Sequence, residues 1–549
     1  MKAHNYTFKH IMGSVLKWHI LLAGLCLALK GYSQAPASIW VEKYGSTLNN
    51  VDEAFALALD DTGNVYVTGK IANTGGSDFC LLKYDNNGIL LWDTSYNGPA
   101  NNIDVAKLIK IDNSGNICIA GSSVGVGSAA DYCIIKYNPS GIPLWITRYN
   151  GPGNSSDIPA DLEVDSMDNI YVSGSSVDTN GGNAFATVKL NSSGGINWVS
   201  RYQGALGIDA EPYSMDIDDS GNIYVGGYEF LTIQDGNYAL LKYDSAGLLL
   251  WIRNYQGQWN DYDQIVGVEC GSSGHIYVAG TSNYNVSPDK FGIAIIKYKS
   301  NGDSVWTRRY DVWWTNWPNE MVLGNNERVY ITGFMQTIPD IDSINFLTIA
   351  CDSSGNFMWA QVFNGPGQTV DEPNAIAVDD SNNVYITGFS AAGNGLVDYT
   401  TIKYDSTGAQ KWIVTYNGLL NSSDVANDIA VDSVGNIYVT GVGWEGLPFD
   451  RQMVTIKYGY PSGLADHPLY VNSVLLSPNP FSTSAMLSVK GSIREAEVEI
   501  FDLCGNKMKT LRMSSGAAEI HREDLAAGIY FYRIISDGNI FANGKMIIQ

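Results

Sequence analysis

The chain has 549 residues, of which 45% are hydrophobic and 16% are charged, and its formal net charge is −23. This length exceeds one small domain, and the hydrophobic content suffices for a substantial core. The acidic balance argues against nucleic acid or anionic membranes as partners.

The first residues have the pattern of a secretory signal peptide. Lys2, Lys9, Lys17 and Lys30 occur among residues 1–36 without any acidic residue. The apolar run 20–29 is followed by small residues up to Ala35, which predicts a cleaved signal peptide over residues 1–35. That run is too short for a membrane anchor and no later stretch is suitable, so no membrane span is expected.

The central part of the chain is repetitive. A strand-like segment ends in glycine eight times, 52 to 55 residues apart, at Gly69, Gly121, Gly174, Gly227, Gly280, Gly333, Gly388 and Gly441. Tryptophan recurs at nearly the same spacing, at Trp40, Trp92, Trp145, Trp198, Trp251, Trp306, Trp359 and Trp412. A fixed period of this length indicates a repeat architecture.

Each repeat predicts four short antiparallel strands. In the first copy they are expected over residues 54–59, 65–69, 79–84 and 89–96. Two short loops, Asp60–Asn64 and Asp85–Gly88, begin with Asp and carry Gly near their end, which is typical of hairpin turns. Four strands per repeat of this length indicate a β-propeller blade.

The two series are offset in a way that predicts how the propeller closes. Trp40 precedes the first complete repeat, whereas the last repeat ends near Tyr458 without its tryptophan strand. The N-terminal strand would therefore complete the last blade as its outermost member. We expect an all-β protein whose residues 36–460 form an eight-bladed β-propeller closed by this N-terminal outer strand.

The periodicity stops after Tyr458. Residues 461–472 are a polar segment with Pro, Gly and Ser and are predicted to be a linker. Residues 473–549 contain short alternating strands, which predict a small C-terminal β-sandwich.

Two family resemblances follow from these patterns. The repeat, as in Asp424 to Tyr458, resembles the bacterial β-propeller repeat family called SBBP. The tail, with Pro478-Asn479-Pro480-Phe481, residues 498–507 and residues 525–534, resembles the type A C-terminal sorting domain of the type IX secretion system. That resemblance implies recognition of residues 473–549 by the secretion machinery. It also implies delivery to the outer surface of a Gram-negative bacterium or to its surroundings.

Catalytic and metal-binding patterns are weak. The histidines after the signal segment are His275, His467 and His521, and they form no nucleophile–His–acid pattern, so no catalytic residue is assigned. The turn Asp216–Asn222 resembles the start of a calcium loop but lacks its final Glu, so no metal or cofactor is expected, with calcium as the alternative. Cys118 and Cys133 fall on adjacent expected strands, where either a disulfide or buried free thiols are compatible with the sequence.

Two further residue series recur in the repeats. The aspartates precede the first strand, at Asp52, Asp104, Asp157, Asp209, Asp261, Asp371 and Asp424. The lysines end the third strand, at Lys83, Lys136, Lys189, Lys242, Lys297, Lys403 and Lys457. We expect the aspartates to bind amides of the inter-blade connections and the lysines to pair with neighbouring acids.

Departures from the repeat are better candidates for a ligand site. After the signal segment, five tryptophans fall outside the tryptophan series, at Trp259, Trp313, Trp314, Trp317 and Trp444. The first four are expected in connections between blades and the fifth in a loop on the same rim, opposite the tight turns. Such exposed aromatic residues suit a glycan or a surface protein, although packing over the irregular sixth repeat is the competing interpretation.

The sequence thus predicts a secreted or surface-displayed binding scaffold. One alternative is a quinoprotein-like oxidoreductase, since Tyr243 to Trp251 resembles the tryptophan-docking repeat of those propellers, but the chain lacks their pair of adjacent cysteines. The other alternative is a structural component of a larger surface assembly.

Overall fold

The computed structural model contains two compact units, divided between Gly459 and Tyr460, which we call the repeat domain and the tail domain. The described residues are 35–46, 51–232, 235–257, 263–286, 289–310, 315–336, 344–393, 395–444, 450–460, 474–477, 479–489, 495–502, 506–514, 516–523, 525–536 and 539–549. The expected signal peptide, except for its last residue, and the expected linker lie outside these ranges.

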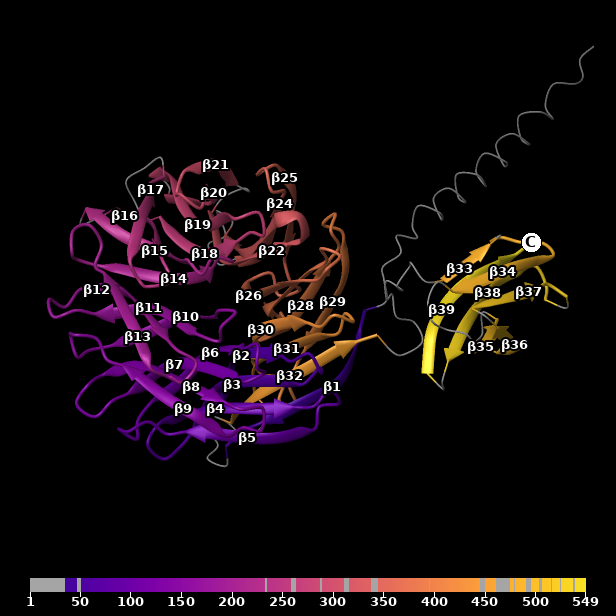
Figure 1. The fold of residues 1–549 in the computed structure, drawn as a ribbon, viewed down its shortest axis with the longest axis horizontal. Helices are drawn as coiled ribbons and strands as arrows, with labels where there is room; N and C mark the ends of the chain where they lie inside the picture. The colour runs from indigo at the N-terminus through magenta and orange to yellow at the C-terminus, as the bar shows by residue number, and fades with distance from the viewer. Residues whose placement is uncertain are drawn as a thin grey trace, which may run out of the picture. The chain divides into compact units, whose positions relative to one another are not determined.

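Within the described residues, the repeat domain consists of eight four-stranded antiparallel sheets (Figure 1). The first four are sheet 1 with β2 (Glu53–Leu59), β3 (Val65–Ala72), β4 (Ser77–Tyr84) and β5 (Leu90–Tyr96); sheet 2 with β6 (Asp104–Ile111), β7 (Ile117–Val124), β8 (Ala130–Tyr137) and β9 (Pro143–Tyr149); sheet 3 with β10 (Asp157–Val164), β11 (Ile170–Val177), β12 (Asn183–Leu190) and β13 (Ile196–Tyr202); and sheet 4 with β14 (Ala210–Ile217), β15 (Ile223–Thr232), β16 (Asp235–Tyr243) and β17 (Leu249–Tyr255).

The next three sheets repeat this order, and the eighth takes its fourth strand from the beginning of the chain. They are sheet 5 with β18 (Gln264–Cys270), β19 (His275–Val286), β20 (Asp289–Lys299) and β21 (Ser304–Tyr310); sheet 6 with β22 (Thr315–Gly324), β23 (Arg328–Gln336), β24 (Ile344–Cys351) and β25 (Phe357–Phe363); sheet 7 with β26 (Asp371–Val378), β27 (Val384–Ala391), β28 (Val397–Tyr404) and β29 (Gln410–Tyr416); and sheet 8 with β30 (Val425–Val431), β31 (Ile437–Trp444), β32 (Arg451–Gly459) and β1 (Ala37–Tyr44). A short 3₁₀ turn, η1 (Asn325–Glu327), links β22 to β23.

The tight turns have the chemistry expected from their sequence. In the first, the Asp60 carboxylate accepts the backbone N–H groups of Thr62 and Asn64, both at 2.9 Å, and Gly63 has a φ of +80°. Side-chain capping of this kind holds a hairpin turn, and glycine adopts the positive φ without steric cost. In the repeats that carry this Asp, the hairpin between the first and second strands is therefore favoured by local sequence.

The sheets pack face to face through small apolar cores. One core joins sheets 2 and 3, with Cys118 and Tyr132 from the former and Leu162 from the latter. Another joins sheets 8 and 1, where Trp40 and Tyr438 pack with Leu57. Each first strand contacts the first strand of the next sheet, and β30 contacts β2, so the first and last sheets are neighbours.

The N-terminal strand pairs as its sequence position predicts. β1 lies antiparallel to β32, with Val41 opposite Ile456 and Lys43 opposite Val454. The indole N–H of Trp40 then donates to the carbonyl of Asn86 in sheet 1, at 3.2 Å. β1 thereby links the last sheet to the first.

The five cysteines in the described part of the chain are free. Cys118 contributes to the core between sheets 2 and 3, whereas Cys133 contributes to the core between sheets 1 and 2. Their side chains thus point to opposite faces of sheet 2, which rules out a disulfide between them in this structure. Of the two alternatives, buried free thiols are the correct one for this pair.

The tail domain corrects the prediction of a β-sandwich. It is one seven-stranded sheet in the order β33-β34-β37-β36-β35-β38-β39, curled into a half-barrel over a single core. Its strands are β33 (Val474–Ser477), β34 (Ser484–Val489), β35 (Glu495–Phe501), β36 (Lys507–Ser514), β37 (Ala517–His521), β38 (Gly528–Ser536) and β39 (Asn539–Ile548). The sequence shows alternation along each strand, but alternation does not reveal whether neighbouring strands continue one sheet or begin a second.

No helix among the described residues is both long and apolar enough to cross a bilayer.

Candidate functional site

The recurring aspartates bind backbone amides, as predicted. Asp104 accepts the N–H of Gly98 at 2.6 Å and that of Val124 at 3.2 Å. Asp424 likewise accepts the N–H groups of Gly418 and Trp444, at 2.6 and 2.9 Å. These carboxylates tie the connection that enters a sheet to the end of its second strand, so their oxygens are engaged in holding the blade together.

Two members of that series differ from the prediction. In sheet 5 the position is taken by Asp263, which accepts the N–H of Gly257 at 2.6 Å, whereas Asp261 lies outside the described residues. In sheet 4 the strand register places Ala210 at the position, and Asp209 accepts the N–H of Asn183 instead. Variable connection lengths explain both differences, since spacing in the sequence fixes register only when the loops are equal.

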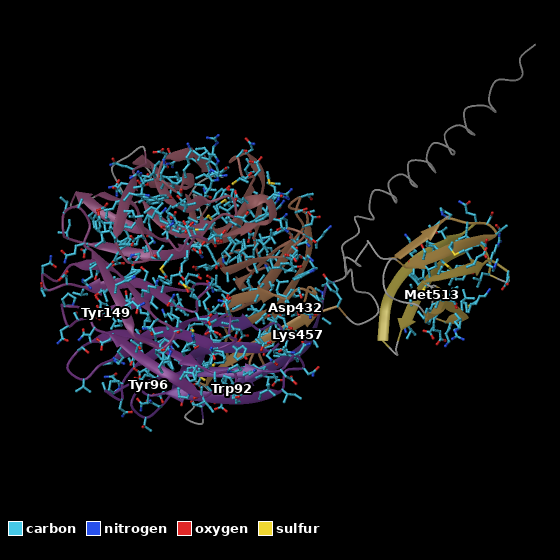
Figure 2. All side chains as sticks on the ribbon, viewed as in Figure 1. Trp92, Tyr96, Tyr149, Asp432, Lys457 and Met513 are labelled. Atoms are coloured by element: carbon cyan, nitrogen blue, oxygen red, sulfur yellow. The ribbon has the colours of Figure 1, made fainter. Side chains whose placement is uncertain are left out.

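The recurring tryptophans and most of the recurring lysines connect neighbouring sheets; Figure 2 labels Trp92 of sheet 1 and Lys457 of sheet 8. The indole N–H of Trp92 and the ammonium of Lys83 both donate to the carbonyl of Pro139, each at 3.2 Å. The same ammonium lies 4.8 Å from the centre of the Tyr66 aromatic ring. Trp198 with Lys189, Trp251 with Lys242, Trp306 with Lys297, and Trp40 with Lys457 converge in the same way on the carbonyls of Ser245, Ser300, Ser353 and Asn86.

The lysines therefore act mainly through a carbonyl and an aromatic face, and the predicted pairing with acids applies to a minority. Lys136 forms a buried ion pair with Asp112 at 2.6 Å, and Lys297 lies 3.5 Å from Glu327. A neighbouring turn supplies a carbonyl at this place in most repeats, which satisfies the ammonium without a second charge.

The irregular sixth repeat compensates for a missing residue in the fifth. Gly271 begins the tight turn of sheet 5, where six of the eight repeats have Asp and sheet 6 has Gly324. Glu327 in η1 of sheet 6 supplies the missing carboxylate, accepting the N–H of Ser273 at 2.7 Å and the hydroxyl of Tyr277 at 2.8 Å. These hydrogen bonds and the nearby Lys297 lower the pKa of Glu327 to about 2, against the opposing effect of its burial.

Charged side chains from the first strands face one another across the repeat domain. They come from sheets 2, 3, 4, 5, 6 and 8, and we call them the axial cluster: Lys110, Asp161, Glu163, Asp216, Glu269, Glu320 and Asp428. Lys110 pairs with Glu163 at 2.7 Å. The axial cluster thus contains one cationic side chain, Lys110, and six carboxyl groups.

Several of these carboxyl groups also join adjacent sheets. Asp161 accepts the N–H of Met215 at 2.7 Å, and Glu320 accepts that of Ile376 at 2.8 Å. Asp428 accepts the N–H of Leu57 at 2.7 Å, which links sheet 8 to sheet 1. The axial cluster is therefore bound into the contacts between first strands.

Burial makes the axial carboxyl groups weak acids. It raises the pKa of Glu320 to about 8, with a further contribution from the charge of Asp428. Burial also raises the pKa of Asp428 to about 6 and that of Glu163 to about 7, although Lys110 opposes both shifts. The pKa of Glu269 rises well above its usual range for the same reason, reinforced by Asp216 and Glu163.

The predicted aromatic site is described only in part. Trp259, Trp313 and Trp314 lie outside the described residues. Trp317 lies within β22, not in the connection where it was expected, and its aromatic ring packs 4.4 Å from that of Phe291 and 6.4 Å from that of Phe334. Trp444 ends β31 and has the Arg451 guanidinium 4.5 Å from its ring centre.

A groove that the sequence analysis did not identify lies between sheets 3 and 4. Its volume is about 420 Å³, and its lining includes Ser175 and Asn183 from sheet 3 and Glu211 and Tyr213 from sheet 4. Tyr213 occupies the bulge of β14, between Pro212 and Ser214. The signal in the sequence was Tyr213 itself, because most other first strands carry a small or polar residue at the bulge, with Phe55 of sheet 1 as an exception.

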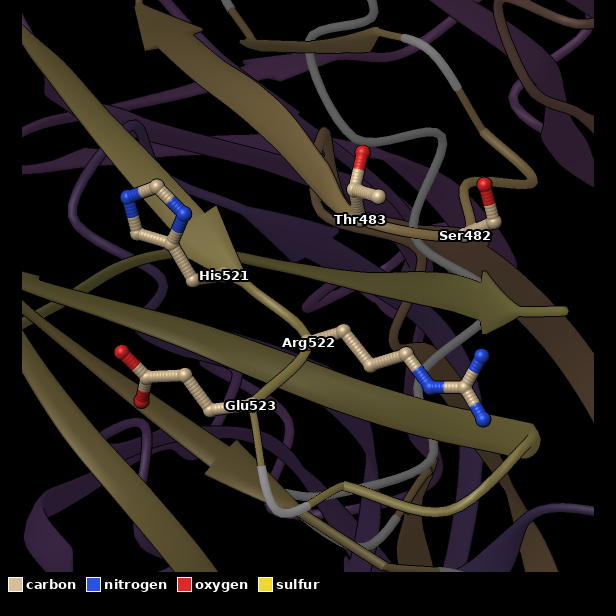
Figure 3. A pocket seen from close by; sticks show the side chains of 5 residues that line it. All are labelled: Ser482, Thr483, His521, Arg522 and Glu523. Atoms are coloured by element: carbon tan, nitrogen blue, oxygen red, sulfur yellow. The ribbon is translucent and has the colours of Figure 1, made fainter.

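The tail domain has a shallow depression of about 400 Å³ lined by Ser482, Thr483, His521, Arg522 and Glu523 (Figure 3). Arg522 donates to the backbone carbonyl of Gln549 at 2.5 Å, and its own N–H binds the carbonyl of Thr483 at 2.8 Å. Glu523 pairs with Lys509. The Arg522 side chain thus holds Gln549 against the half-barrel.

Across the described residues, no three His, Cys, Asp or Glu side chains are grouped closely enough to hold a metal ion. The aspartate of the calcium-like turn, Asp218, instead accepts the N–H groups of Ser220 and Asn222, each at 2.9 Å.

The sheets and their repeated contacts define a β-propeller repeat protein with a separate half-barrel tail. Family models agree: β-propeller repeats of the SBBP family match residues 200–228, 359–394 and 413–448, and a secretion system C-terminal sorting domain matches residues 476–549. The chain therefore carries SBBP repeats and a sorting domain of the type IX secretion system, which directs a protein to the cell surface or the extracellular space.

Individual proteins are similar only distantly. An uncharacterized WD repeat-containing protein of Acanthamoeba polyphaga mimivirus is 22% identical over 493 residues, which cover 75% of this chain but 32% of that protein. The chain thus spans about a third of that relative's length. Among solved structures, PorZ, a surface component of the type IX secretion system of Porphyromonas gingivalis, is 12% identical with a TM-score of 0.32, covering 90% of this chain and 74% of PorZ. An ulvan lyase from a new family of polysaccharide lyases is 10% identical with a TM-score of 0.40, covering 76% of this chain and 96% of its own.

Proposed function

We propose that this chain is an exported binding protein of a Gram-negative bacterium. In this proposal an eight-bladed, closed β-propeller is displayed on the surface or released, and it binds a glycan or a surface protein. The tail domain serves as the address that the secretion machinery recognises, and the repeat domain carries the binding surface.

The observation that carries the proposal is that the repeated residues hold the sheets together, whereas the aromatic residues that depart from the repeat do not belong to these repeated contacts. The repeated Asp, Trp and Lys side chains are engaged in hydrogen bonds within and between sheets, as Asp104, Trp92 and Lys83 illustrate. The departures at Tyr213, Trp317 and Trp444 lie at the starts of first strands or the end of a second strand. In an antiparallel sheet these positions lie at the same end of the strands, opposite the tight turns, where the connections vary in length.

Closure of the propeller is supported by three contacts between sheets 8 and 1. The Leu57 N–H reaches Asp428 at 2.7 Å, the Asn427 amide reaches the carbonyl of Ala54 at 2.7 Å, and the Trp40 indole reaches Asn86. A closed circle of sheets leaves only short protected edges, which suits a protein that must persist outside the cell.

The function is tested with the full-length protein purified from the secreting cells. Immobilised protein is offered soluble polysaccharides and solubilised envelope proteins of the producing organism. The proposal expects saturable retention of one of them, and it fails if neither a polysaccharide nor an envelope protein is retained.

Export is tested separately by removing residues 476–549. The shortened protein is expected to accumulate inside the outer membrane, and the proposed role of the tail domain is wrong if it reaches the medium as the full chain does.

A further inference from the structure

We propose that the groove between sheets 3 and 4 is a carbohydrate subsite that binds a neutral pyranose unit of a polysaccharide. This inference rests on the proposed binding function and assigns one ligand class to one place in the repeat domain. The groove lining combines an exposed aromatic ring with a carboxylate and an amide, and the Asn183–Glu211 hydrogen bond joins sheets 3 and 4 within it.

The aromatic ring of Tyr213 is positioned as a platform. It stands 6.1 Å from the ring of Tyr228 at an interplanar angle of 26°, and the ring of Phe230 packs edge-on against Tyr228 at 5.5 Å. One face of Tyr213 is therefore supported, while the residue keeps 36% of its surface exposed. A fixed, solvent-exposed aromatic face attracts the C–H face of a pyranose, because the ring face is apolar and carries partial negative charge.

The polar groups beside this platform suit sugar hydroxyl groups. The Glu211 carboxylate accepts the Asn183 amide at 2.5 Å and the Tyr213 hydroxyl at 3.3 Å. A carboxylate offers about four acceptor positions, so these two bonds orient it and leave acceptor capacity for a ligand O–H. Asn183 in turn presents an amide oxygen, and it is held because its backbone N–H donates to Asp209 at 2.8 Å.

The part of the lining that comes from sheet 3 includes several apolar side chains. Ile158, which is 46% exposed, faces the groove with Ala160 and Val177, and Ser175 adds a hydroxyl. The volume of about 420 Å³ is within the range of roughly 300–1,000 Å³ typical of small-molecule sites. Apolar side chains, an aromatic ring and hydrogen-bonding groups in one groove suit the amphipathic surface of a pyranose.

The negative charge at the groove favours a neutral sugar over an acidic one. The chain has a formal net charge of −23, and the polar group nearest the platform is the Glu211 carboxylate. A uronate or a sulfated sugar would bring a second negative charge next to this carboxylate, which costs binding free energy.

The test uses the full-length protein in native gels that contain a soluble polysaccharide. A β-glucan, a mannan and a xylan serve as neutral probes, and alginate serves as the acidic probe. At least one neutral polysaccharide is expected to retard the protein, and alginate is not. Tyr213→Ala is expected to weaken binding about tenfold or more, and Glu211→Gln about threefold, because the amide keeps one acceptor oxygen but loses the charge.

Two further variants separate binding from folding. Tyr213→Phe keeps the aromatic platform and is expected to bind as tightly as the natural protein, in contrast to Glu211→Gln. Phe55→Ala removes an aromatic ring from the matching bulge of sheet 1 and is expected to bind normally. Thermal unfolding of each variant shows whether the fold is intact, and if Tyr213→Ala does not fold, Glu211→Gln and Tyr213→Phe carry the comparison.

Several results would overturn the subsite. These are unchanged binding by a folded Tyr213→Ala protein, an equal loss in Phe55→Ala, or retardation by alginate alone. If no polysaccharide retards the natural protein but an envelope protein is retained, the subsite is wrong while the proposed binding function stands. If neither is retained, both are wrong.

Discussion

Replacing Glu320 with Gln tests whether burial raises the pKa of a carboxyl group in the axial cluster. Burial raises the pKa of Glu320 from 4.5 to about 8. A shift of this size corresponds to at most about 5 kcal/mol of differential stabilisation, and the partial exposure of the residue reduces the expected effect to about 1–2 kcal/mol. Glutamine keeps an oxygen that accepts the N–H of Ile376, which lies 2.8 Å from the natural carboxylate, so the substitution removes the charge and not the hydrogen bond.

The sign of the effect follows from the raised pKa. The folded protein holds the proton of Glu320 more tightly than the unfolded chain, so this contribution is complete below pH 4.5 and is lost as the pH rises to about 8. The two proteins should be equally stable near pH 4.5, and Glu320→Gln should be more stable by about 1–2 kcal/mol at pH 8.5.

Urea unfolding at pH 4.5, 6.5 and 8.5 measures this difference. Asp219→Asn, a charge removal at an exposed turn residue, is the matched control and is expected to show no comparable trend. A difference between the natural protein and Glu320→Gln that stays constant across the three pH values would refute the assignment of Glu320 as a neutral buried acid.

Three other predictions follow from the contacts between sheets. Glu327→Gln should destabilise the protein by about 1 kcal/mol at pH 7, because it weakens the hydrogen bonds to sheet 5. Since the pKa of Glu327 is lowered to about 2, the difference in stability between the two proteins should shrink as the pH falls from 4.5 toward 2. Thermal unfolding measures this difference. Trp40→Ala and Trp92→Ala should each cost about 3 kcal/mol in urea unfolding, and a much smaller cost for Trp40→Ala would argue against closure through β1. Non-reducing peptide mapping should recover Cys118 and Cys133 as separate free thiols, and a cross-linked peptide would contradict their placement on opposite faces.

Much of the repeat domain was predictable because local sequence and repetition agree. Asp and Gly identify the tight turns in the sequence, as at Asp60 and Gly63. The offset of Trp40 from the last repeat identifies the strand that completes sheet 8. The role of the repeated aspartates also followed from their position, since a residue required in nearly every blade is a structural one.

The errors and omissions have a common cause in contacts between distant residues. Glu327 replaces a carboxylate missing from a turn more than fifty residues earlier in the chain, and no spacing rule links it to Tyr277. The axial cluster exists because Glu320 and Asp161 come from sheets far apart in sequence, so their mutual proximity appears only once the sheets are arranged. The tail domain was predicted as two sheets because strand patterns do not specify strand order.

The central claim is that ligands bind at the ends of the strands opposite the tight turns. Backbone amide hydrogen exchange tests this claim most directly. The full-length protein is compared with and without the partner it retains in the binding screen. The account predicts slowed exchange at the starts of first strands and the ends of second strands, including residues 157–160, 175–177 and 211–213. Protection confined to the tight turns, such as residues 85–88 and 138–141, would contradict it.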